Sequence, residues 1–127
     1  MWGSLALGRT SVLAFLAGKQ SILSAYSTTT ALGATQYLLT YDYIPEVLEK
    51  RGPYREGHLG LAQQLIDEGK CLSGGPTGEP GMEVPTGALF IFTDEESAKI
   101  FVEGDPYVSN GIVTGHSIQE WNVALQK

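Results

Sequence analysis

The chain has 127 residues, of which 43% are hydrophobic, and its 14 acidic and 8 basic side chains give a formal charge of −6. This length accommodates one domain and a terminal extension, but no second hydrophobic core. All the acidic residues and six of the basic ones lie at or after Asp42. The chain therefore lacks the clustered Lys and Arg that nucleic-acid binding requires. The single cysteine, Cys71, excludes an intramolecular disulfide.

Residues 1–36 differ from the rest in composition, with no acidic residue, two basic residues and ten Ser or Thr. This composition is typical of an organellar transit peptide, and it predicts import into the mitochondrion or, alternatively, the chloroplast. A secretory signal with an apolar region at 11–18 and a structured N-terminus are the alternatives. Arg9 and Lys19 leave too few apolar residues between them for a spanning helix of about 20 residues, so no stable membrane insertion is expected. The folded domain is expected over 37–127.

The remaining sequence alternates strand-like and helix-like patterns that glycine and proline interrupt. The expected strands cover 37–43, 70–75, 86–93 and 112–123. The expected helices cover a segment that begins at Pro45, a second from 53 or 54 to Gly69, and a third over 95–103. Residues 76–85 contain three Pro and two Gly and are expected to form a mobile loop, and 104–107 are expected to form a turn.

The order β-α-β-β-α-β predicts an α+β fold of the ferredoxin-like type, with a four-stranded antiparallel sheet. Two helices cover one face of such a sheet, and the other face remains open. A domain of about 90 residues often gains stability by pairing such a face with a second subunit. The sequence therefore predicts a homodimer.

One histidine lies on the inward face of the helix expected over 53–69. His58, Leu61, Ala62, Leu65 and Ile66 fall at the spacing of one helical face. Arg55 lies three residues before His58 and Arg51 seven before it, on the same side. The histidine is thus expected at the edge of the core with a cation one turn away.

Several motifs in a fixed order carry a family resemblance. They are Arg55-x-x-His58-Leu59, Asp67-Glu68-Gly69-Lys70 with Leu72 and Gly74-Gly75-Pro76, Gly104-Asp105-Pro106-Tyr107, and Gly111-Ile112-Val113. Together they resemble the YciI-like (YCII-related) proteins over about 90 residues from Tyr37 onward. The resemblance implies a ferredoxin-like, dimeric α-β barrel with a cleft beside a histidine and an aspartate proposed as an acid/base pair. It also implies, as chemical precedent, a relative that removes chloride from a chlorinated hydroxyquinol. By position, the pair is His58 and Asp105.

This pair suits proton transfer, because a free histidine side chain, with a pKa of about 6.5, exchanges protons at neutral pH and a carboxylate fixes its tautomer. Arg55 is expected to bind an anionic or enolate oxygen of the substrate. Tyr107, Gly75 and Pro76 are expected to line the same pocket. The hypothesis is a cofactor-independent lyase or isomerase that acts on a small oxygenated substrate.

The alternative is a non-catalytic module that binds a small ligand or a protein, with a structural histidine and an Asp-Pro pair that only starts a turn. His58, His116, Asp105 and Cys71 have no metal-ligand spacing, so no metal is predicted. Gly74 to Gly78 lack the Lys-Ser/Thr of a phosphate-binding loop.

Overall fold

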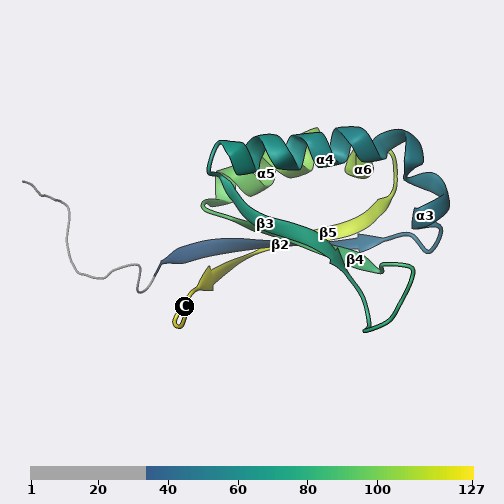
Figure 1. Ribbon diagram of the computed structural model, residues 1–127. Coiled ribbons are helices and arrows are strands. Elements are labelled where there is room, and N and C mark those ends of the chain that lie inside the picture. Colours follow the sequence, from purple (N-terminus) through teal and green to yellow (C-terminus); the bar gives the residue numbers. More distant parts are fainter. Residues whose placement is uncertain (1–33) are drawn as a thin grey trace, which may run out of the picture. The chain divides into compact units, whose positions relative to one another are not determined.

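The computed structural model describes residues 34–127, of which Gln36–Trp121 form one compact unit (Figure 1). Its sheet has four strands in the order β3-β4-β2-β5. The strands are β2 (Thr35–Tyr43), β3 (Cys71–Thr77), β4 (Gly87–Phe92) and β5 (Val113–Asn122). β4 pairs antiparallel with both β2 and β3. This is the ferredoxin-like arrangement of an α+β protein, so the predicted fold is confirmed.

The helices lie on one face of this sheet (Figure 1). They are α3 (Val47–Lys50), α4 (Gly52–Asp67), α5 (Glu95–Gly104) and α6 (Pro106–Ser109). α4 ends where Gly69 adopts a φ of 76°, a left-handed conformation that glycine adopts without strain. Asp94 is the N-cap of α5, and its side chain accepts a hydrogen bond of 2.7 Å from the Ser97 amide.

Strand alternation divides the side chains between the two faces of the sheet. The register pairs Leu39 with Phe90, and both side chains are buried beneath the helices. Phe101 of α5 packs against Phe90 with the ring centroids 4.8 Å apart. The neighbouring pair, Leu38 and Ile91, points to the opposite face, which none of the described helices covers (Figure 1).

The first short helix begins at Val47 rather than at Pro45, and three other predicted boundaries were wrong for local reasons. α4 begins at Gly52 rather than after it, because a proline is tolerated within the first turn of a helix. β3 continues through Pro76, which was assigned to a loop, because β3 is an edge strand and proline is accepted there. The turn expected over 104–107 instead begins helix α6 at Pro106, with Asp105 as its N-cap.

Candidate active site

The centre of the site is the carboxylate of Asp105, which is completely buried. It accepts hydrogen bonds from three donors, the Tyr41 hydroxyl at 2.8 Å, the Tyr107 amide at 3.0 Å and Nδ1 of His58 at 2.9 Å. Burying a carboxylate is costly unless such donors surround it. The network therefore fixes the position of Asp105 and, through Nδ1, the orientation of the His58 ring.

His58 lies on α4 with 4% of its surface exposed. Its ring stacks on the ring of Tyr107, with centroids 3.8 Å apart and an angle of 3° between the planes, and it meets Phe90 edge-on at 5.8 Å. Because Nδ1 donates to the carboxylate, Nε2 is the ring nitrogen that can accept a proton. The histidine is thus held in one orientation and one tautomer.

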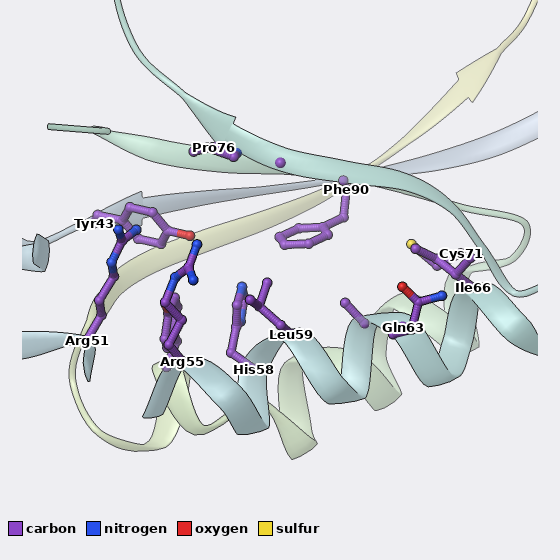
Figure 2. A pocket seen from close by; sticks show the side chains of 14 residues that line it. Tyr43, Arg51, Arg55, His58, Leu59, Gln63, Ile66, Cys71, Pro76 and Phe90 are labelled. Carbon is purple, nitrogen blue, oxygen red and sulfur yellow. The ribbon is translucent and has the colours of Figure 1, made fainter. Parts of the chain in front are cut away.

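A cavity of about 350 Å³ lies between α4 and β3, and His58 lines it (Figure 2). Four of the other predicted site residues line it as well: Arg55, Gly75, Pro76 and Tyr107. Asp105 does not line the cavity; it lies behind His58 and is linked to that residue by a hydrogen bond to Nδ1. All six predicted residues therefore meet in one place, although the first and last of them, Arg55 and Tyr107, are 52 positions apart in the sequence.

The cavity is chemically uneven along its length. Arg51, Arg55 and Tyr43 gather at one end in Figure 2, and Ile66 and Cys71 lie at the other, with His58 between them. Burial raises the pKa of Tyr43 to about 12, although the positive charge of Arg51 acts in the opposite direction. The hydroxyl of Tyr43 therefore remains protonated at neutral pH and can donate a hydrogen bond.

The sequence interpretation missed three aromatic residues of the site, Tyr41, Tyr43 and Phe90. Burial raises the pKa of Tyr41, and the negative charge of Asp105 raises it further, so the phenol stays protonated and donates. Alternation within the first strand placed Tyr41 toward the core, where a tyrosine hydroxyl needs a partner. That signal indicated a buried acceptor, but the sequence could not show which one.

The remaining candidates lie outside this network. Cys71 is buried, its Sγ lies 3.5 Å from the Ser73 carbonyl oxygen, and burial raises the pKa of its thiol. His116 is exposed on β5.

Within residues 34–127 there is no group of three or more His, Cys, Asp or Glu side chains arranged to bind a metal ion. None of the helices in this part of the chain is long and apolar enough to span a membrane.

The described fold is similar to that of a solved enzyme. The 5-chloro-2-hydroxyhydroquinone dehydrochlorinase TftG of Burkholderia phenoliruptrix, solved in complex with 2,5-dihydroxybenzoquinone, superposes with a TM-score of 0.58 at 26% sequence identity. The match covers 68% of the present chain and 93% of TftG.

Curated relatives come from bacteria. Protein YciI of Escherichia coli is 37% identical over 79 residues, which are 57% of the present chain and 81% of that protein. An uncharacterised protein of Haemophilus influenzae is 35% identical over 83 residues, which are 60% of the present chain and 85% of that protein. That these relatives are bacterial proteins contradicts the predicted transit peptide and both predicted destinations. The prediction depended on composition, which is not specific to import, and residues 1–33 lie outside the described part of the chain.

A family model also matches most of the chain. The model for the YCII-related domain matches residues 35–122, which include every strand and helix described above. The ordered motifs around His58 and Asp105 lie within this range. The chain therefore belongs to the YCII-related family.

Proposed function

We propose that the protein is a cofactor-independent enzyme, a lyase or an isomerase, that transfers a proton on a small oxygenated substrate. One observation carries this proposal: Nδ1 of His58 is bound to a completely buried carboxylate while the same ring lines an open cavity. A histidine in this arrangement can act as a general base through Nε2. Asp105 would orient the ring and stabilise the imidazolium that forms.

In the proposed reaction, Nε2 of His58 removes a proton from a hydroxyl or an acidic carbon of the substrate. The electron pair left behind moves into the conjugated system, and negative charge develops on an oxygen of the substrate. In a lyase acting on a chlorinated quinol, the ring carbon that bears chlorine first takes up a proton, and removal of a proton from a second hydroxyl then expels chloride, so that one H+ and one Cl− leave in total. In an isomerase a proton returns at another atom and no group leaves. Neither route requires an oxidant, a reductant or a second substrate.

The similarity to TftG supports the choice of substrate class. TftG is named for the removal of hydrogen chloride from a chlorinated hydroxyhydroquinone, and its structure holds a dihydroxybenzoquinone. In the present chain Phe90 and Leu59 provide apolar walls to the cavity, and Tyr107 provides an aromatic one. These walls suit a planar ring.

A substitution of His58 tests the proposal. We expect the wild-type protein to release chloride from chlorinated hydroxyquinols or to exchange their ring protons with deuterated solvent, as NMR would detect. His58→Asn should lower the rate by about 10²–10⁴-fold, the usual contribution of a general base. His116→Asn is the matched control because His116 is exposed and does not line the cavity, and its rate should not change.

The same experiment separates the enzyme from the alternative of a ligand-binding module, which the near-complete burial of His58 also fits. If the wild-type protein binds the quinol probes but neither releases chloride nor exchanges protons, the catalytic proposal is wrong. If His58→Asn melts at a much lower temperature and activity follows only the folded fraction, the histidine is structural.

We also propose that the protein is a homodimer that pairs the open faces of two sheets. Leu38, Leu89 and Ile91 are half-buried on that face, and Trp121 is 40% exposed. A patch of this kind indicates a protein contact. Sedimentation equilibrium should give twice the chain mass, and Ile91→Lys should shift the protein toward the monomer. A wild-type monomer at micromolar concentration would contradict the proposal.

A further inference from the structure

We infer that Arg51, Arg55 and Tyr43 form a separate anion-binding subsite, and that the substrate carries a carboxylate at the end of the molecule distant from its apolar part. This inference rests on the proposed function, because it takes the cavity beside His58 as the substrate pocket. It extends that function by assigning Arg51 a role and by naming a chemical class for the ligand.

The first support is that neither arginine forms an ion pair with an acidic side chain among residues 34–127. The ion pairs among residues 34–127 are His58–Asp105, Lys70–Glu68 and Lys99–Glu95, and neither Arg51 nor Arg55 takes part in any of them. Glu79 and Glu83 share an adjoining groove with both arginines, yet no ion pair forms there. Two guanidinium groups at one end of a cavity repel each other unless an anion lies between them.

The second support is that both positive charges act on the cavity itself. Arg51 and Arg55 line it, and both charges act to lower the pKa of Tyr107, against the larger effect of burial. Arg51 acts on Tyr43 in the same way. The positive potential is therefore directed toward the rings around His58 rather than only toward solvent.

The third support is the polarity of the opposite end. Figure 2 places Ile66 and Cys71 across the cavity from the arginines, and Ala62 and Leu59 also line it. A ligand that fills the space thus has an apolar body near Phe90 and an anionic group near Arg51 and Arg55. Arginine binds carboxylates through two parallel hydrogen bonds, and the Tyr43 hydroxyl supplies a further donor. A hydroxylated aromatic carboxylate has this shape and charge, and fits a cavity of about 350 Å³.

Calorimetric titration with two matched probes tests the inference. Hydroquinone and 2,5-dihydroxybenzoate differ only in the carboxylate, and the carboxylate should bind at least about tenfold more tightly, as one charge-assisted contact provides. Arg51→Gln and Arg55→Gln should each remove about tenfold of the affinity for 2,5-dihydroxybenzoate and change that for hydroquinone less than about twofold. Arg55→Lys, which keeps the charge but not the planar fork, should give an intermediate value.

Lys50→Gln is the control for charge, because Lys50 precedes Arg51, is exposed and does not line the cavity. It should leave both affinities unchanged. The inference is wrong if hydroquinone binds as tightly as the carboxylate, or if the arginine variants weaken both probes equally. It is also wrong if phenyl phosphate binds more tightly than benzoate, which would assign the subsite to phosphate.

These titrations need no turnover, so they are independent of the proposed chemistry. Tight binding of 2,5-dihydroxybenzoate without proton exchange would support the anion-binding subsite and contradict the proposed enzyme activity. Proton exchange on quinols that lack a carboxylate, together with equal affinities for the two probes, would support the proposed enzyme activity and contradict the anion-binding subsite. Melting curves of each variant establish that the compared proteins are folded.

Discussion

Asp105→Ala should lower the free energy of unfolding by about 3–5 kcal/mol, the usual cost of removing one partner of a buried charged pair. The substitution leaves the Tyr41 hydroxyl, the Tyr107 amide and Nδ1 of His58 without their acceptor in the core. It also removes the N-cap of α6. Because small domains are stable by only about 5–15 kcal/mol in total, a substantial unfolded fraction is expected under mild denaturing conditions.

Two further variants identify the cause of this loss in urea denaturation. Tyr41→Phe removes one donor and leaves the carboxylate with two, so it should cost about 1 kcal/mol. Asp105→Asn keeps one carbonyl acceptor and should fall between the other two variants. It should also abolish catalysis, because an amide does not stabilise the imidazolium. A loss below about 1 kcal/mol for Asp105→Ala would show that the buried network contributes little to stability.

The fold could be predicted because its signals are local. Glycine and proline separated the elements, and apolar periodicity distinguished the helix that carries His58 from the strands beside it. The errors at Gly52, Pro76 and Pro106 arose because proline and glycine were taken to interrupt an element. In the structure each lies inside an element, at an edge strand or a first turn.

The site was only partly predictable, because hydrogen bonds join residues that are distant in sequence. Tyr41 and Asp105 are 64 positions apart and His58 and Asp105 are 47 apart. The pairing of His58 with Asp105 came from the resemblance of the motifs, and nothing local indicated Tyr41 as a partner. Arg51 is a related case. Helical periodicity placed it on the side of His58, but the sequence did not show that β3 lies opposite α4 and encloses the cavity that Arg51 lines.

Gly74 of β3 is the position where a small change in the sheet should most affect the cavity. A Cβ atom built at Gly74 would overlap Cδ1 of Phe90, and the Phe90 ring in turn meets His58 and Phe101. Glycine is therefore required by this close approach, although β3 is an edge strand. Gly74→Ala should force the ring to move and lower the free energy of unfolding by about 2 kcal/mol, within the range for overpacked cores.

Gly75→Ala is the matched control, because Gly75 is the next residue of the same strand and no heavy atom lies within 4 Å of its added Cβ. Both variants lose the same backbone freedom in the unfolded chain, so their difference in urea denaturation isolates the contact with Phe90. The displaced ring should also weaken binding of 2,5-dihydroxybenzoate in the Gly74 variant, because Phe90 forms part of the cavity wall beside His58. If the two variants prove equally stable, the Phe90 ring has room to move, and the cavity is less rigid than this packing implies.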